Sequence, residues 1–210
     1  MFITFEGPDG SGKSTQIKRL AERLRAEGRQ VLLTREPGGT AIGEQIRNVL
    51  HDLHNTAMQP RAEILLYSAA RAQLVGEVIL PHLAGGGVVL SDRYYDSTLA
   101  YQGYGHGLDL AALRQITAFA THGLKPDVTL LFDLDPDLGL QRRLANREEW
   151  NRLDAYDLAF HQRVRAGYLE LLRAEPERWI RLDAAQEREA LAEAVWACLL
   201  PRLPARAPAA

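Results

Sequence analysis

The stretch Gly7-Pro8-Asp9-Gly10-Ser11-Gly12-Lys13-Ser14 decides the fold, because it follows a short apolar run and opens a helical pattern. It fits Gly-x-x-x-x-Gly-Lys-Ser/Thr, a loop whose glycines let backbone N–H groups turn inward around phosphate oxygens. The N-terminus of the following helix adds partial positive charge there. We expect Lys13 to reach the β- and γ-phosphates of a nucleotide and the Ser14 hydroxyl to ligate Mg²⁺. The predicted nucleotide-binding residues are Gly7, Pro8, Asp9, Gly10, Ser11, Gly12, Lys13, Ser14 and Thr15.

Apolar runs alternate with helical patterns along the rest of the chain. Because these runs are apolar on both faces, they predict a parallel sheet covered on both sides by helices. We therefore expect an α/β fold, a three-layer α/β/α arrangement around a five-stranded parallel sheet. Strands are expected at 2–5, 31–34, 88–90, 128–132 and 179–182, and helices at 14–27, 42–52, 61–83, 110–122, 137–145, 160–174 and 187–200.

Length and composition indicate one domain over 1–200 of the 210 residues, followed by a Pro/Ala-rich segment, 201–210, that we expect to be flexible. A net charge of −2 argues against a broad basic surface for nucleic acid. No run reaches the roughly 18 apolar residues of a membrane span. The N-terminus has no signal-peptide pattern, and a single cysteine excludes an internal disulfide. We expect a cytoplasmic protein without a nucleic-acid or membrane partner.

Two predicted strands end in charged residues, and ligands of such sheets bind beyond the carboxyl ends of the strands. One strand leads into Thr34-Arg35-Glu36-Pro37-Gly38-Gly39-Thr40, where Arg35 on a rigid turn suits a second phosphate. Another leads into Ser91-Asp92-Arg93, where Asp92 matches the acid that holds Mg²⁺ beside a phosphate loop. Arg93 would then point at the transferring or accepting phosphate. This set of charges predicts phosphoryl transfer between two phosphates.

A phosphate loop by itself does not name a function, since switch GTPases, ATP-driven machines and small-molecule kinases all use one. The nearest string to a guanine reader, 124–127, lacks the Asn and precedes a strand, so we interpret it as a turn. A DNA-translocating ATPase would be longer and more basic. A kinase of another acceptor (dUMP, dCMP or a non-nucleotide) and a switch that acts through a partner remain alternatives.

Four strings together resemble those of the thymidylate kinase family, of the bacterial type with arginines in its lid. They are Asp9 in the phosphate loop, the segment 34–40, the segment Tyr67-Ser68-Ala69-Ala70-Arg71, and the segment Asp92-Arg93-Tyr94-Tyr95-Asp96-Ser97-Thr98-Leu99-Ala100-Tyr101-Gln102-Gly103. The resemblance covers about residues 2–182. It implies the nucleoside-monophosphate-kinase branch of the P-loop fold, a homodimer, and Mg²⁺. It also implies phosphoryl transfer from ATP to dTMP, giving dTDP and ADP, a step in dTTP supply for DNA synthesis.

The resemblance also implies roles at the acceptor phosphate and sugar. Asp9 would accept a hydrogen bond from the 3′-hydroxyl, and Arg35 and Arg93 would hold the phosphate. Tyr101 would lie under the sugar, where it would crowd a 2′-hydroxyl.

At the base, the resemblance assigns stacking to Tyr67 and a donor to thymine O4 to Arg71. Ser97, Thr98 and Gln102 complete the implied substrate-binding set, with Thr98 and Gln102 near the base edge. An Arg donor suits O4 of thymine and offers no acceptor to the amino group of cytosine.

The segment at about 141–155 resembles the family's lid over ATP. The phosphate loop carries no Arg, so we expect the lid to supply positive charge to the transferring group. Arg152 is the first candidate and Arg147 the second; an exposed, salt-bridged helix with Glu148 and Glu149 is the alternative. The expected catalytic residues are Lys13, Asp92, Arg93, Arg147 and Arg152, with Ser14 and Asp92 at the metal.

Three further expectations concern single segments. Gly103, Gly105 and Gly107 predict a turn after a helix that ends near Tyr101. The apolar face of 61–83 fits either a core helix or the dimer interface that the family builds in this region. His51 and His54 have no third ligand at metal spacing and are expected on the surface.

Overall fold

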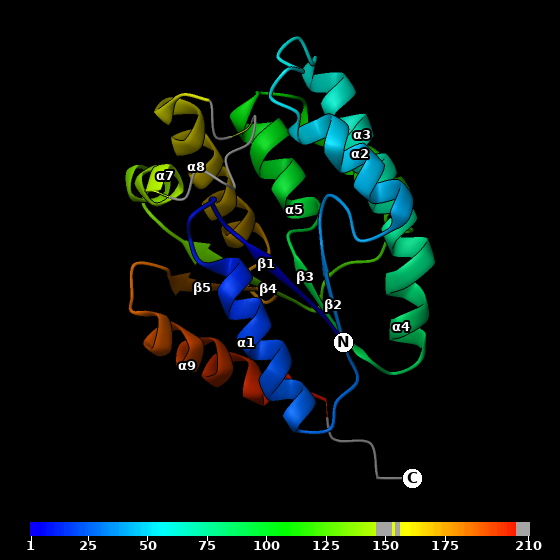
Figure 1. Ribbon diagram of the computed structural model, residues 1–210, viewed down its shortest axis with the longest axis vertical. Helices are drawn as coiled ribbons and strands as arrows, with labels where there is room; N and C mark the ends of the chain where they lie inside the picture. The colour runs from blue at the N-terminus through cyan, green and yellow to red at the C-terminus, as the bar shows by residue number, and fades with distance from the viewer. Residues whose placement is uncertain (146–152, 154–155, 205–210) are drawn as a thin grey trace.

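The computed structural model describes residues 1–145, 153 and 156–204. Five strands form one parallel sheet in the order β2-β3-β1-β4-β5, which confirms the predicted α/β class (Figure 1). Every strand extends one or two residues beyond its predicted end, because each closes on a charged residue that an apolar pattern does not include. The strands are β1 Phe2–Glu6, β2 Val31–Arg35, β3 Val88–Asp92, β4 Val128–Asp133 and β5 Trp179–Asp183.

Helices cover both faces of the sheet, as the two-sided apolar strands require. Phe5, Leu90 and Phe132 pack in the cluster that also holds the buried faces of α1 and α9, whereas Phe2 and Val89 pack in the cluster on the other face. Figure 1 shows α1 and α9 together on one side and α2, α3 and α4 on the other. The helices are α1 Lys13–Ala26, α2 Ala41–His51, α3 Pro60–Leu74, α4 Leu80–Ala84, α5 Tyr95–Thr98, α6 Leu110–Ala120, α7 Pro136–Ala145, α8 Leu158–Ala174 and α9 Arg188–Leu199.

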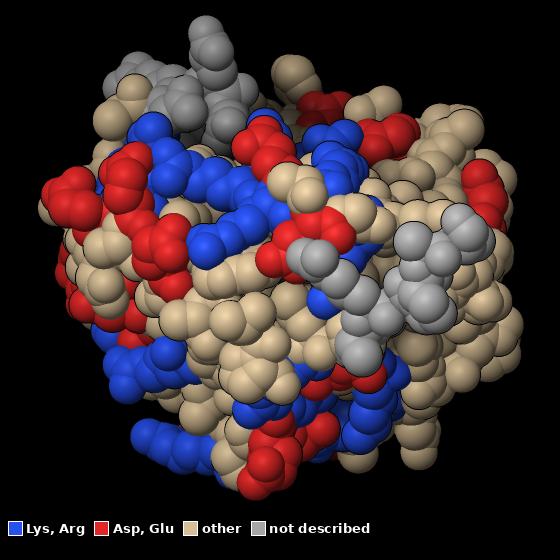
Figure 2. Space-filling model, turned by 90° about the horizontal axis from the view of Figure 1, so that it is seen from below, with Lys and Arg blue, Asp and Glu red and all other residues tan. Residues whose placement is uncertain are grey.

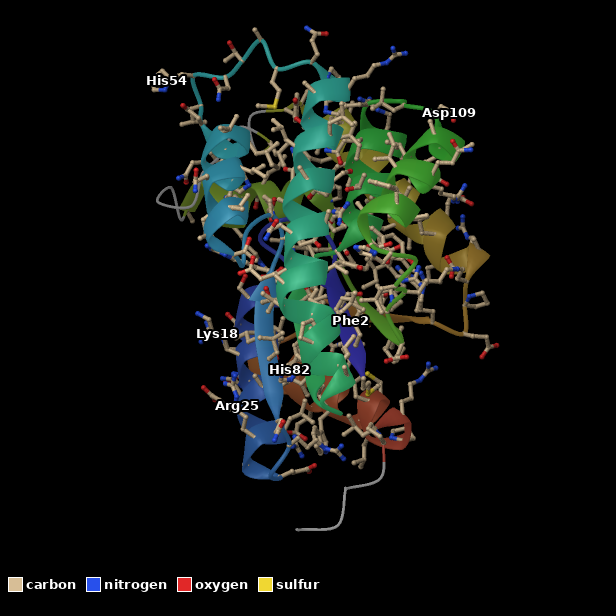
Figure 3. The ribbon with its side chains drawn as sticks, turned by 90° about the vertical axis from the view of Figure 1, so that its right-hand side faces the viewer. Phe2, Lys18, Arg25, His54, His82 and Asp109 are labelled. Carbon is tan, nitrogen blue, oxygen red and sulfur yellow. The ribbon has the colours of Figure 1, made fainter. Side chains whose placement is uncertain are left out.

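The predicted helix 61–83 is one long stretch, Pro60–Ala84, whose middle is the π-helical segment Val75–Ile79. Among the described residues it is the stretch long and apolar enough to cross a membrane. Leu74, Val75 and Ile79 are fully buried in the core, and α2 and α6 pack on α3. Its place in the core therefore accounts for its apolar composition. Figure 3 shows the stretch from the side, with His82 near its lower end.

The glycine-rich turn predicted at 103–107 is wrong in part. The structure continues α5 into a π-helical segment, η2 Leu99–Gly105, which contains the first two of these glycines. A Cβ on Gly103 would lie 2.5 Å from Leu110 Cδ2, and one on Gly105 would lie 2.7 Å from Phe160. These glycines therefore permit close packing. Only Gly107, with φ 74°, serves the turn.

The described end of the chain is tied to the domain at two points. Arg29 donates to the carbonyl of Pro204 at 3.0 Å, and Arg202 donates to that of Glu177 at 2.7 Å. The rest of the predicted flexible tail, 205–210, lies outside the described residues. On the face seen in Figure 2, basic and acidic side chains are interspersed.

Candidate active site

A cleft of about 710 Å³ opens beyond the carboxyl ends of the strands, where the sequence placed the chemistry. Its walls come from the phosphate loop, the ends of β2 and β3, and helices α2, α3, α5 and α7, together with η2. Most of the predicted site residues line it: Asp9, Gly10, Gly12, Lys13, Ser14, Thr15, Arg35, Tyr67, Arg71, Asp92, Arg93, Ser97, Thr98, Tyr101 and Gln102. Arg147 and Arg152 lie outside the described residues.

The phosphate loop depends on glycine for its curvature and its close packing. Gly7, Gly10 and Gly12 have φ of 134°, 78° and 86°, in the region that other residues rarely adopt. A Cβ on Gly7 would collide with the Phe132 carbonyl, and one on Gly10 would lie 2.5 Å from the Gly139 carbonyl. The loop is therefore seated against β4 and α7 while its helix, α1, begins at Lys13.

Lys13 is buried at the head of α1, where its ammonium is folded back on the loop. Nζ donates to the carbonyls of Gly7 at 3.0 Å and Pro8 at 2.7 Å, and to Ser11 Oγ at 3.3 Å. Burial and the nearby Arg93 lower the pKa of Lys13 to about 8. A bound polyphosphate would reverse this effect, because its negative charge favours the ammonium form.

Ser14 and Asp92 bring two oxygen atoms together beside the phosphate loop. The Ser14 hydroxyl donates to Asp92 Oδ2 at 2.7 Å, so the first turn of α1 and the end of β3 meet at this point. A hydroxyl and a carboxylate are ligands that suit Mg²⁺, which takes its remaining ligands from phosphates and water. The described residues hold no cluster of three or more His, Cys, Asp or Glu side chains that could bind a metal alone.

Arg93 occupies the centre of the cleft in a strained backbone conformation, with φ 72°. Its guanidinium donates to Asp9 Oδ1 at 2.7 Å, Ser97 Oγ at 2.9 Å, and the hydroxyls of Tyr168 at 3.1 Å and Tyr101 at 3.2 Å. Burial opposes its charge, but the charge of Asp9, together with Tyr101, Tyr168 and Glu6, outweighs burial and holds the pKa of Arg93 well above its usual value. Burial likewise opposes the Asp9 carboxylate, and Arg93 and Lys13 hold its pKa well below the ordinary range.

Glu6 lies beneath this network, fully buried at the end of β1. Oε1 accepts the backbone N–H of Tyr94 at 2.8 Å, and Oε2 accepts the hydroxyls of Ser97 at 2.6 Å and Tyr168 at 2.9 Å. Burial and the neighbouring Asp96 raise the pKa of Glu6 to about 7. The sequence analysis missed this residue. Its one signal was a carboxylate that directly follows an apolar strand.

Arg71 on α3 is fully buried, and one of its guanidinium nitrogen atoms has no hydrogen-bond partner among the described residues. Nε donates to Glu36 at 2.7 Å and Nη2 to Thr98 Oγ1 at 3.1 Å, whereas Nη1 has no hydrogen-bond partner among the described residues. Tyr67, one helical turn earlier, lines the same part of the cleft. The peptide bond between Glu36 and Pro37 is cis.

Arg35 lies at the mouth of the cleft, with its side chain 52% exposed. Its Nη2 donates to both carboxylate oxygens of Glu44, at 3.0 and 2.9 Å. An exposed ion pair contributes little to stability, so exchanging Glu44 for a ligand phosphate would cost little.

Eight further residues line the cleft to which the sequence analysis gave no role there: Glu36, Pro37, Arg47, His51, Tyr94, Arg142, Arg143 and Leu153. Arg142 donates to the carbonyls of Gly10 at 3.3 Å and Ala184 at 3.2 Å, next to the phosphate loop. Arg47 donates to the Pro37 carbonyl at 2.9 Å, at the turn that follows β2. His51, which was expected on the surface, is half-buried here. For the three arginines, the available signal was a basic side chain on a helix next to the predicted site, Arg47 on α2 and Arg142 and Arg143 on α7.

Comparison with known proteins places this geometry in one family. A family model described as thymidylate kinase matches residues 5–195. The chain is 58% identical to a thymidylate kinase of Roseiflexus sp. (strain RS-1), over 97% of this chain and 95% of that protein. It is 54% identical to one of Deinococcus radiodurans, over 96% of this chain and 97% of that protein. The crystal structure of a thymidylate kinase from Ehrlichia chaffeensis superposes with a TM-score of 0.78 at 34% identity, covering 95% of this chain and 98% of that one.

The buried carboxyl group of Glu6 makes stability depend on pH. Its pKa rises from 4.5 to about 7 on folding, so between these values the folded chain keeps a proton that the unfolded chain has released. Wild-type stability therefore falls as pH rises through this window. Glu6→Gln, which stays neutral, removes this dependence. We expect wild type to lose on the order of 2–3 kcal/mol relative to Glu6→Gln between about pH 5 and pH 8.

Urea unfolding of both proteins at several pH values measures this difference. Parallel curves of unfolding free energy against pH for the two proteins would contradict the assignment. Glu193→Gln, a change in an exposed pair with Arg23, is the control and should follow wild type.

Proposed function

The chain belongs to the thymidylate kinase family and transfers the γ-phosphoryl group of ATP to dTMP, giving dTDP and ADP, and we propose here which residues perform this transfer. The observation that carries the proposal is a single cleft in which a phosphate loop faces Arg71, whose buried Nη1 has no partner among the described residues. The phosphate loop supplies hydrogen-bond donors for a polyphosphate, and Arg71 supplies a hydrogen-bond donor for a base carbonyl. The reaction is a step in dTTP supply for DNA synthesis.

On the donor side, backbone N–H groups of residues 7–15 and the ammonium of Lys13 hold the phosphates of ATP. Lys13 exchanges the loop carbonyls for phosphate oxygens as the nucleotide binds. Ser14 and Asp92 hold Mg²⁺, because their oxygen atoms already meet at 2.7 Å. When bound, this ion neutralises charge on the β- and γ-phosphates.

On the acceptor side, Arg93 and Arg35 hold the phosphate of dTMP. Arg93 is preorganised by four hydrogen-bond acceptors. Arg35 instead breaks its ion pair with Glu44 when the phosphate binds. Asp9 accepts a hydrogen bond from the 3′-hydroxyl of the sugar through an oxygen that does not face Arg93. Tyr101, fixed by the same guanidinium, lies under the sugar and disfavours a 2′-hydroxyl.

At the base, the ring of Tyr67 stacks on thymine, and Arg71 Nη1 donates to O4. A base with an amino group in place of O4 would leave Arg71 Nη1 buried and unpaired. This strongly favours thymine over such a base. Thr98 holds the other end of the Arg71 guanidinium, and Ser97 and Gln102 complete the pocket.

The chemistry needs no strong general base, since the attacking oxygen atom belongs to an anionic phosphate. Catalysis is alignment together with neutralisation of the charge that develops on the transferring group. Lys13 and Arg93 supply positive charge from the two sides. Arg152, with Arg147 second, supplies it from the lid, which closes over ATP and excludes water.

We also propose a cytoplasmic homodimer. Phe119 on α6 is 88% exposed and Leu65 on the neighbouring α3 is 58% exposed. Large apolar side chains on adjacent helices mark an interaction surface, and a second copy of this chain would cover them.

Release of ADP in the presence of Mg·ATP and one monophosphate at a time tests the acceptor. We expect ADP mainly with dTMP, less with dUMP, and little with dCMP, dGMP, AMP or no acceptor, with dTDP confirmed as product. Equal ADP in every reaction, including the one without acceptor, would mean an ATPase and would reject the acceptor site.

Single replacements in the lid separate its two arginines. We expect Arg152→Met to lower kcat on the order of 10²–10³-fold with little change in KM for dTMP, because it removes charge stabilisation in the transition state. Arg147→Met should have a smaller effect. Arg173→Met, an exposed change on α8, is the matched control. A larger loss in Arg147→Met would exchange the two roles, and wild-type kcat in both variants would reject a lid contribution.

A charge placed on the apolar face tests the dimer. Phe119→Glu should convert a dimer into a monomer in sedimentation or light-scattering measurements, since an unpaired carboxylate would be buried at the interface. Leu53→Glu, at a residue that is also 51% exposed, should leave the dimer intact. A monomeric wild type, or a dimeric Phe119→Glu, would place the interface elsewhere.

A further inference from the structure

Glu63 is a buried carboxylate next to the base pocket to which the roles above assign nothing. It lies on α3 and is 1% exposed. Its Oε1 accepts a hydrogen bond from Nε2 of Gln102 at 2.6 Å. Nε2 of His106 lies 3.6 Å from the same carboxylate oxygen. Two nitrogen atoms from η2 and the residue after it therefore face this carboxylate, and only Gln102 among these partners lines the cleft.

The hydrogen bond to Glu63 decides which way the Gln102 amide faces. An amide has a donor on one side and an acceptor on the other, and the Glu63 oxygen accepts from the donor side at 2.6 Å. The NH₂ group of Gln102 must therefore point toward Glu63, which turns Oε1 away from it. A reversed amide would set two acceptor oxygens against each other in a buried place, where an unsatisfied polar atom costs about 1–3 kcal/mol. The orientation of the amide is thus determined by this hydrogen bond as well as by shape.

Arg71 is oriented in the same manner by a second buried carboxylate. Glu36 binds its Nε at 2.7 Å and thereby leaves Nη1 available as a donor. Two fully buried carboxylates, each from a different part of the chain, hold the side chains at the base pocket. One holds a donor, Arg71, and the other an acceptor, Gln102.

This pair matches one edge of a pyrimidine and opposes another. Thymine and uracil present O4 as acceptor beside N3–H as donor. Cytosine presents an amino donor beside a bare N3 acceptor, so both of its polar atoms are reversed. A cytosine base would leave a donor facing a donor and an acceptor facing an acceptor in a desolvated site.

We propose that Glu63 is a specificity-determining positioning residue, which acts through Gln102 by keeping the amide oxygen available to a base that carries N3–H. The proposal rests on the roles proposed above for Arg71 and the base pocket. It assigns to Glu63 an effect on the choice between dTMP and dCMP, which a carboxylate that only supports the fold would not have.

Glu63→Gln tests this with almost no change in shape. The new amide can donate to Gln102 Oε1 as well as accept from its NH₂, so the Gln102 amide becomes free to reverse. We expect the ratio of kcat/KM for dTMP to that for dCMP to fall about tenfold, with most of the change in KM. Glu77→Gln, an exposed carboxylate in the π-helical segment that follows α3, is the matched control and should keep the wild-type ratio.

A double-mutant cycle shows whether Glu63 acts through Gln102. Gln102→Leu should lower the ratio by itself, and adding Glu63→Gln in that background should change it no further. An unchanged ratio in Gln102→Leu would overturn the proposal even if Glu63→Gln failed to fold. Equal losses for both substrates in Glu63→Gln, together with a lower Tm, would also overturn it and leave Glu63 a purely structural residue. A wild type that does not prefer dTMP to dCMP would instead reject the proposed base pocket.

Discussion

The hydrogen bonds of the Arg93 guanidinium are the constraint on which the site depends. They join the phosphate loop through Asp9, α5 through Ser97, η2 through Tyr101 and α8 through Tyr168. A residue with a backbone φ of 72° needs such partners, because this backbone conformation is unfavourable by itself. Glu6 then ties two of the partners, and the residue after Arg93, to the end of the central strand. The cation that we propose to bind the acceptor phosphate is thereby held in place by the protein itself.

The same arrangement recurs around the cleft: a buried carboxyl group accepts hydrogen bonds from side chains at the cleft or from residues that hold them. Glu6 does so for the partners of Arg93, Glu36 for Arg71, and Glu63 for Gln102. Burying a carboxylate is costly, and a hydrophobic replacement often gives equal stability. What these groups contribute is orientation, since a paired polar group has one arrangement of donors and acceptors where an apolar group has none. Preorganised charge is also what a reaction without a general base requires.

The elements that the sequence predicted are those encoded over short distances. Each strand, the phosphate loop, and the convergence of Arg35, Asp92 and Arg93 follow from local patterns and from one rule on parallel sheets. The carboxylates behind the site could not be predicted in this way, because Glu6 meets Ser97 and Tyr168 across 91 and 162 residues. The π-helical course of η2 was missed because helical periodicity assumes 3.6 residues per turn. In this protein, the residues that line the cleft were thus easier to predict than the buried residues that orient them.

The arginines of α7 bear on which cation reaches the transferring phosphoryl group. Gly139 brings the backbone of α7 so close to the loop that an added Cβ would lie 2.9 Å from the Asp9 carbonyl. On this helix Nη1 of Arg142 donates to two carbonyls. Arg143 is 7% exposed, and its charge helps to hold the pKa of Asp9 down. Neither arginine is therefore disposed to follow a charge that moves between donor and acceptor. This supports the proposal that a cation beyond the end of the helix, on Arg152 or Arg147, supplies charge to the transferring group.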